Sequence, residues 1–312
     1  MEIEKTLQSI REAVARAVVG KGEAVDLILT ALLCGGHVLI EDVPGVGKTT
    51  LVRALAAALG LSFRRIQFTP DLTPSDVTGF TLVDLRTGET RRVEGAVMRQ
   101  LILADEINRT GPKTQSALLE VMQEGQVTVD GETVPVPRPF LVLATQNPLG
   151  LAGTYPLPEA QLDRFLLCVH MGYPAPGEEV RILDLARGGT RPEDLPAVTS
   201  AQEILEMQRR CREVKTAEAV KQYVVRIAEE TRRDRNVSLG ASPRASLMLL
   251  TASMAWALLH GRDYVLPDDV QRLAVPVLAH RIRLKAQAGY PQKSAEDVVR
   301  AIVGSLRVPT GL

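Results

Sequence analysis

The stretch LIEDVPGVGKTT, residues 39–50, decides the fold, because it begins as an apolar strand and continues as a glycine-rich loop. Gly45 and Gly47 precede Lys48 and Thr49, which open a helical segment. In a strand–loop–helix unit of this kind, backbone N–H groups surround a phosphate and the helix N-terminus adds its dipole. The lysine reaches the outer phosphates, and the hydroxyl that follows it binds magnesium. We therefore expect a nucleoside triphosphate site here.

The loop opens with Asp42, at a position where such loops usually carry glycine. That glycine is the least diagnostic member of the motif, and an aspartate leaves the ring of backbone amides in place. The alternative interpretation is a glycine-rich turn without a ligand. The Lys48–Thr49 pair, placed between an apolar strand and a helix, favours phosphate binding. The residues expected along the phosphates are Pro44, Gly45, Val46, Gly47, Lys48, Thr49 and Thr50.

Two further strands end in polar side chains. LILADEINR, residues 101–109, places Asp105 and Glu106 at the carboxyl edge of the expected sheet. There Asp105 can hold magnesium through water, and Glu106 can orient and polarise the attacking water. LVLATQNP, residues 141–148, ends in the amides Gln146 and Asn147, and an uncharged amide there could hydrogen-bond the attacking water or the outer phosphate. Alone, either ending is an ordinary strand end or turn, so both assignments depend on the loop.

The chain up to residue 187 alternates uniformly apolar strands with helices, which predicts a parallel sheet covered on both faces. Two alternating segments, 80–94 and 126–137, are predicted to be hairpins that project from this sheet. We expect an α/β core over residues 1–187, a linker over 188–199 that is rich in glycine and proline, and an all-helical lid domain over 200–312.

In the helical part, Ser200 and Glu203 form a capping box. Further along, four apolar residues share one helical face, which we expect to lie in the core. They are Leu247, Leu250, Met254 and Leu258.

The composition disfavours some classes of protein. The 312 residues carry 37 basic and 37 acidic side chains, and only 4% are aromatic. Binding to single-stranded nucleic acid requires a basic groove and stacking faces, which this balance does not favour. The two most apolar stretches, 27–40 and 247–259, are shorter than the roughly 20 residues that span a bilayer. We expect a cytoplasmic protein without a membrane span.

The cysteines and histidines suggest no metal site at this level. Three widely separated cysteines predict neither a disulfide framework nor a zinc knuckle. We expect the four histidines to be structural or solvated, because no ligand spacing to a second metal-binding residue is evident. They are His37, His170, His260 and His280.

Taken together, these segments resemble the MoxR family of AAA+ ATPases, in the branch with a helix-2 insert. The resemblance rests on the three strand motifs and on longer matches such as RRIQFTPDLTPSDVTGF (64–80), TQSALLEVMQEGQVTVDGE (114–132), GTYPLPEAQLDRF (153–165) and GASPRA (240–245). The form EDVPGVGKT, with Asp42, is also common in that family. The resemblance covers nearly the whole chain.

The resemblance implies a magnesium-dependent ATPase that assembles as a ring, a hexamer, with ATP between subunits. It identifies Asn147 with sensor 1 and Arg164 with the arginine finger. It identifies Arg244 with sensor 2, and it places Val19 and Gly20 against the adenine. The segments 80–94 and 126–137 correspond to the helix-2 insert and the pre-sensor-1 hairpin.

The chemistry of phosphoryl transfer supports the arginine roles. Negative charge builds up on the outer phosphate, and a guanidinium stabilises it in the transition state. Arg109 in DEINR is a rival to Arg164 for the finger. Arg244 stands in the first turn of an expected helix, where the dipole disfavours a cation, which is mild evidence for a functional role.

The function implied is the remodelling or activation of protein partners, among them a protein with a von Willebrand factor A domain. This remodelling would serve the maturation of enzyme complexes or the insertion of metal cofactors. A nucleic-acid motor is an alternative, since helicases share both hairpins and the first is locally basic through Arg86, Arg91, Arg92 and Arg99. A nucleotide-gated scaffold and a subunit like that of magnesium chelatase are further alternatives.

Overall fold

The computed structural model describes residues 2–146, 153–285 and 293–310. Its centre is a five-stranded sheet in which every neighbouring pair is parallel. The strand order is β2 (Phe63–Gln67), β5 (Leu101–Asp105), β8 (Leu141–Gln146), β1 (Val38–Glu41) and β9 (Leu167–Val169). The predicted parallel sheet and its α/β class are therefore confirmed.

Helices cover both faces of this sheet, as its apolar strands require. In β1, Val38 and Ile40 pack into one core cluster and Leu39 into the other, because successive side chains point to opposite faces. The first cluster includes buried residues of α1 (Glu2–Ala15), α2 (Gly22–Cys34) and α3 (Lys48–Ala58), and the second those of α4 (Pro74–Thr78) and α5 (Pro112–Glu124).

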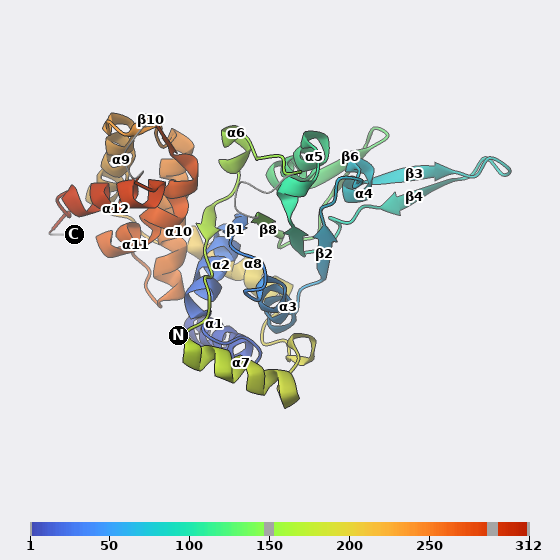
Figure 1. Ribbon diagram of the computed structural model, residues 1–312, viewed down its shortest axis with the longest axis horizontal. Helices are drawn as coiled ribbons and strands as arrows, with labels where there is room; N and C mark the ends of the chain where they lie inside the picture. The colour runs from blue at the N-terminus through green and yellow to red at the C-terminus, as the bar shows by residue number, and fades with distance from the viewer. Residues whose placement is uncertain (1, 147–152, 286–292, 311–312) are drawn as a thin grey trace.

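The two predicted hairpins are present and lie outside the central sheet. The strands are β3 (Gly79–Val83) with β4 (Thr90–Glu94), and β6 (Gln126–Val129) with β7 (Glu132–Pro135). Asp130 and Gly131 both have positive φ at the second turn, as a two-residue turn of the Asp-Gly type requires. The first hairpin projects from one end of the molecule, opposite the C-terminal helices (Figure 1). Arg92 and Glu132 form an ion pair of 3.8 Å between the hairpins.

The chain continues from α6 (Glu159–Leu162) and β9 into α7 (Pro176–Gly188) and a segment with a short 3-10 turn, Pro192–Asp194. The capping box of Ser200 and Glu203 is confirmed at the start of the next helix. The C-terminal helices are α8 (Ala201–Cys211), α9 (Glu218–Arg233), α10 (Pro243–Leu259), α11 (Pro267–Leu278) and α12 (Ala295–Ser305). Their buried residues belong to the same core cluster as α1–α3, so this part packs directly on the α/β core.

The C-terminal part departs from expectation at two places. It contains a small antiparallel pair, β10 (Val237–Leu239) with β11 (Arg283–Leu284), in addition to helices. Of the four residues expected in the core, Leu250, Met254 and Leu258 are partly buried and pack against it, but Leu247 is 63% exposed. The fully buried face of α10 is formed mainly by small residues such as Ala245 and Ala252. Because α10 is apolar almost all round, its sequence did not indicate which face would be covered.

His37 is a structural residue, as expected. Its Nδ1 accepts a hydrogen bond from Val142 N at 3.1 Å, so its Nε2 carries the proton and donates to Met122 O at 2.9 Å. Burial lowers the pKa of His37 to about 4, which keeps the ring neutral. Among the helices of the described residues, none has the length and apolar character needed to cross a membrane.

Candidate nucleotide-binding and catalytic site

The glycine-rich loop has the backbone conformation that the sequence predicts. Gly45 and Gly47 have φ angles of 87° and 90°, in the left-handed region that favours glycine, and α3 begins at Lys48. The Lys48 ammonium donates to the carbonyl oxygens of Asp42 (2.9 Å) and Val43 (3.3 Å). The lysine therefore closes the loop on its own backbone.

The pKa of Lys48 depends on nearby acidic residues as well as on burial. Burial lowers the pKa of Lys48, and the negative charges of Asp42, Asp105 and Glu106 act in the opposite direction. The structure thus brings the predicted lysine and both predicted carboxylates into one electrostatic environment.

Asp42 has a role that no glycine could perform. Its Oδ2 accepts hydrogen bonds from the backbone N–H groups of Met171 (2.5 Å) and Gly172 (2.8 Å), just after β9. Its Oδ1 accepts from Val43 N at 2.9 Å. The buried Lys21 ammonium donates to the carbonyl oxygens of Met171 and Gly172, each at 2.9 Å. Asp42 and Lys21 therefore attach the start of the loop to the segment that leads into α7.

The two predicted carboxylates lie at the carboxyl edge of β5. Asp105 Oδ1 accepts from Thr145 Oγ1 at 2.6 Å, and Asp105 Oδ2 forms an ion pair of 2.6 Å with Arg65. Thr145 Oγ1 in turn accepts from Glu106 N at 2.7 Å. Glu106 has a φ of 57°, a left-handed conformation that is uncommon outside glycine and clusters at functional sites.

The Glu106 carboxylate takes part in a network across the end of β2. Its Oε2 accepts from Gln67 Nε2 and from Arg109 Nη1, both at 3.1 Å. Gln67 Oε1 accepts from Arg65 Nη2 at 2.6 Å. Sequence reasoning missed Arg65, Gln67 and Thr145. Gln67 lies opposite Asp105 in the sheet register, so only the strand order could have pointed to it.

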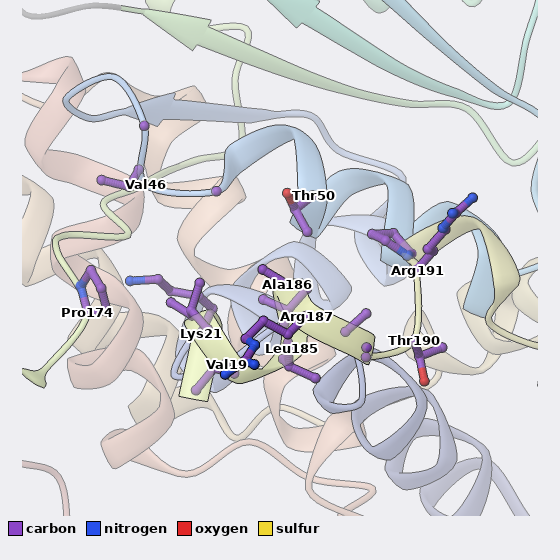
Figure 2. A pocket seen from close by; sticks show the side chains of 18 residues that line it. Val19, Lys21, Val46, Thr50, Pro174, Leu185, Ala186, Arg187, Thr190 and Arg191 are labelled. Atoms are coloured by element: carbon purple, nitrogen blue, oxygen red, sulfur yellow. The ribbon is translucent and has the colours of Figure 1, made fainter. Parts of the chain in front are cut away.

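A cavity of about 610 Å³ lies beside the loop (Figure 2). The predicted residues that line it are Val19, Gly45, Val46, Gly47 and Thr50. Figure 2 shows Val46 and Thr50 above the cavity and residues of α7 below it. The α7 residues and the segment that follows α7 form one wall of the cavity. The sequence pattern did not predict this wall. Its residues include Ile182, Leu185, Ala186 and 187–192.

Not every residue predicted to bind the nucleotide lines this cavity. The predicted residues absent from its described lining include Gly20, Pro44, Lys48, Thr49 and Asp105. Gly20 has a φ of 72°, and a Cβ there would lie 2.3 Å from the Glu178 carboxyl group. The left-handed backbone at this position therefore accounts for the glycine. Asn147 lies outside the described residues.

Arg164 and Arg244 are also absent from the described lining of the cavity. Arg164 is half-buried in the turn after α6, and within the described part of the chain its guanidinium has no hydrogen-bond or ion-pair partner. Arg244 is exposed in the first turn of α10, as predicted.

Asp163 connects the places where these two arginines stand. It precedes Arg164, it forms an ion pair of 2.9 Å with the buried Arg281, and its Oδ2 lies 3.5 Å from the Ser242 hydroxyl at the start of α10. Burial lowers the pKa of Arg281 to about 10, and the charge of Arg244 contributes to this lowering. The turn of Arg164 and the N-terminus of α10 thus meet at one junction.

Comparisons with known proteins agree with this geometry. The ATPase family associated with various cellular activities (AAA) matches residues 37–167, and the AAA lid domain matches residues 229–302. A crystal structure from Cytophaga hutchinsonii superposes with a TM-score of 0.91 at 36% identity, over 99% of this chain and 96% of that one. The loop, the two carboxylates and the lid therefore define an ATPase of the AAA class.

Two relatives match nearly the whole chain. The chain is 51% identical to protein YeaC of Bacillus subtilis, over 96% of this chain and 93% of the relative. It is 42% identical to chaperone MoxR1 of Mycobacterium tuberculosis, over 97% of this chain and 82% of the relative. The chain belongs to the MoxR family of AAA+ ATPases, which confirms the predicted family and nucleotide chemistry.

Proposed function

We propose that the chain hydrolyses ATP with magnesium and uses the cycle to remodel or activate a protein partner. The observation that carries the hydrolysis is the convergence of Lys48, Asp105 and Glu106 at one edge of the sheet, beside a cavity with an apolar wall. The loop residues 44–50 would follow the phosphates, and Val19, with the α7 side chains of Ile182 and Leu185, would enclose the base.

The residues present fit a magnesium ion. Thr49 offers a hydroxyl and Asp105 a carboxylate, which are oxygen ligands of the kind that magnesium prefers. Asp105 accepts three hydrogen bonds, from Thr145 and Arg65. A carboxylate has about four acceptor positions, so one remains for a water on the ion. When bound, the ion neutralises charge on the phosphates.

Glu106 would orient the attacking water. Gln67 and Arg109 both donate to the same carboxylate oxygen, and the left-handed backbone of Glu106 sets the direction of its side chain. Asn147 would complete the site as sensor 1. Arg244 would act as sensor 2 from the start of α10, with its charge toward the phosphates.

We propose a homo-oligomeric ring, a hexamer, in which Arg164 acts on the nucleotide of the neighbouring subunit. Arg164 stands away from the cavity of its own chain, and its guanidinium makes no ion pair among the described residues. Arg109 already donates to Glu106 within the chain, which favours Arg164 as the finger. A ring interface is heterologous, so each site would combine residues of two subunits.

The first hairpin favours a protein as the partner. Its strands and turn expose apolar side chains, among them Leu82, Val83 and Leu85, of which Leu85 is 97% exposed. Two of its basic residues pair with glutamates, Arg92 with Glu132 and Arg99 with Glu94. An exposed apolar patch on a projecting element suits a protein surface. By family likeness, partners would include a von Willebrand factor A domain protein in the cytoplasm and clients that mature as enzyme or metalloenzyme complexes.

The proposed hydrolysis is tested on the purified chain by release of phosphate from ATP. We expect turnover with magnesium and background rates when EDTA removes the ion, because Thr49 and Asp105 are the candidate ligands. Equal turnover with and without EDTA would reject the magnesium assignment. Stimulation of turnover by DNA, lost on adding salt, would instead favour the nucleic-acid motor.

The hairpin is tested by charge reversal. We expect Arg91→Glu with Arg92→Glu to leave basal ATPase intact and to abolish its stimulation by a client, because the hairpin projects away from the phosphate loop (Figure 1). The client is first captured on the Glu106→Gln variant with ATP, and turnover is then measured with and without it. Arg226→Glu with Arg233→Glu on the exposed face of α9 is a control of equal charge change. Loss of basal turnover together with intact client stimulation would reverse this assignment.

A further inference from the structure

A second group of polar side chains lies where the α/β core meets the C-terminal helices. Glu41 ends β1, Cys168 lies in the neighbouring strand β9, and His170 follows that strand. One ligand atom from each of these three residues lies within 4.8 Å of the other two. Glu296 in α12 reaches the same group, with its Oε1 3.2 Å from His170 Nε2.

Sequence reasoning did not weigh one spacing that contributes to this group. Cys168 stands two residues before His170, and side chains two apart on an extended chain point to the same side. The expectation that His170 is merely structural or solvated therefore has an alternative.

Two of the distances are close to those between ligands of a four-coordinate ion. The His170 Nε2–Glu296 Oε1 distance is 3.2 Å and the Cys168 Sγ–His170 Nε2 distance is 3.9 Å. Zinc bond lengths of about 2.0 Å to N or O and about 2.3 Å to S, at a tetrahedral angle, separate such ligand pairs by about 3.3 and about 3.5 Å. These two pairs therefore need adjustments of a few tenths of an ångström, and the Glu41 carboxylate, whose ligand atom lies within 4.8 Å of those of Cys168 and His170, would move closer when the ion binds.

The tautomer of His170 is also suitable. Its Nδ1 lies 2.8 Å from the Glu41 carbonyl oxygen, and a carbonyl only accepts, so Nδ1 carries a proton. In the neutral ring, Nε2 then presents a lone pair toward the Glu296 carboxylate, and two acceptors repel unless a proton or a cation lies between them. A backbone carbonyl that orients a histidine in this way is a common feature of metal sites.

The outer surroundings fit as well. Gln146 Nε2 donates to Glu41 Oε1 at 3.1 Å, and Arg300 donates to Glu296 Oε2 at 2.6 Å, so the carboxylates are oriented from outside. A cavity of about 720 Å³ is lined by all four residues of the group and offers a route for an ion.

We propose that Glu41, Cys168, His170 and Glu296 bind a zinc ion that joins α12 to the α/β core. A thiolate, an imidazole and carboxylates together suit zinc, whereas magnesium and calcium prefer oxygen ligands alone. Glu41 directly precedes Asp42 of the phosphate loop, so the ion would link the position of the C-terminal helices to that loop. The alternative is a bare ion pair between protonated His170 and Glu296.

The test is zinc binding by the tag-free full chain, stripped with EDTA and kept without nucleotide. Zn²⁺ is titrated in competition with a chromogenic chelator, and Co²⁺ is used as a spectroscopic probe of thiolate coordination. We expect one equivalent to bind to the wild type, and binding to weaken by at least roughly 100-fold in Cys168→Ser and in His170→Ala. We expect Glu296→Gln to weaken it by roughly 10-fold and to reduce the rise in melting temperature that zinc causes.

Cys34→Ser and Cys211→Ser are matched controls, because these free cysteines lie outside the group. Both should bind zinc as the wild type does. No stoichiometric binding by the wild type, or equal binding by Cys168→Ser and His170→Ala, overturns the proposal and leaves the ion pair. If Cys168→Ser does not fold, the zinc titrations of the His170→Ala and Glu296→Gln variants test the proposal, because these two side chains are partly exposed.

Discussion

Lys48→Ala should abolish ATP binding, whereas Glu106→Gln should bind ATP and lose turnover. Lys48 donates to the loop carbonyls of Asp42 and Val43, and ATP would take over these hydrogen bonds with its phosphates. Glu106→Gln keeps the shape of the side chain and can still accept from Gln67, but it cannot polarise a water as a carboxylate does. The loss of a general base costs roughly 10²–10⁴-fold in turnover.

Calorimetry with ATP and phosphate release measure the two effects separately. Lys113→Ala and Glu124→Gln are controls of the same chemistry at exposed positions of α5, and both should bind and hydrolyse ATP normally. If Lys48→Ala binds ATP with the affinity of the wild type, the loop is not the phosphate site. If Glu106→Gln retains full turnover, another residue orients the water.

Mixing two inactive variants, Arg164→Ala and Glu106→Gln, should restore part of the ATPase activity. Each variant alone should be nearly inactive, since a finger arginine contributes roughly three to five orders of magnitude where it has been measured. After subunit exchange, an interface is complete when one subunit supplies Glu106 and the next supplies Arg164. Random mixing at equal amounts completes about a quarter of the interfaces in a closed ring.

The matched control is a mixture of Lys48→Ala with Glu106→Gln. In the proposed site both residues act on the nucleotide of their own subunit, so no interface in that mixture would be complete and no activity should return. Exchange is verified with labelled subunits before turnover is measured at several ratios. If the Arg164→Ala mixture stays at background at every ratio, Arg164 is not the finger, and Arg109→Ala is the next variant to mix.

The parts of the site that could be predicted from the sequence depend on neighbouring residues in the chain. Gly45 and Gly47 before Lys48 specify the loop by backbone geometry alone. Asp105 and Glu106 were recognised because they directly follow an apolar strand. The Asp130–Gly131 turn similarly specifies its hairpin. Each of these signals has a range of a few residues, which a single sequence displays.

The sequence pattern did not predict the structure correctly in segments where it fits two arrangements equally well. α10 is apolar on most of its surface, so the periodicity could not show that Leu247 would be exposed and Ala245 and Ala252 covered. The pair β10–β11 joins strands of three and two residues, which are too short to show an alternating pattern.

The sequence by itself thus determined the α/β class, the glycine-rich loop that opens α3, the two carboxylates at the end of β5 and the family. Only the tertiary structure decided what surrounds them. The order β2–β5–β8 brings Arg65 and Thr145 to opposite sides of Asp105, and the path after β9 brings the backbone at Met171 to Asp42. The wall of the cavity and the Glu41–Cys168–His170–Glu296 group arise in the same way. The hydrogen bonds and ion pairs named here join residues 40 to 129 positions apart, and the packing of the sheet and helices, rather than any local pattern, sets which of them meet.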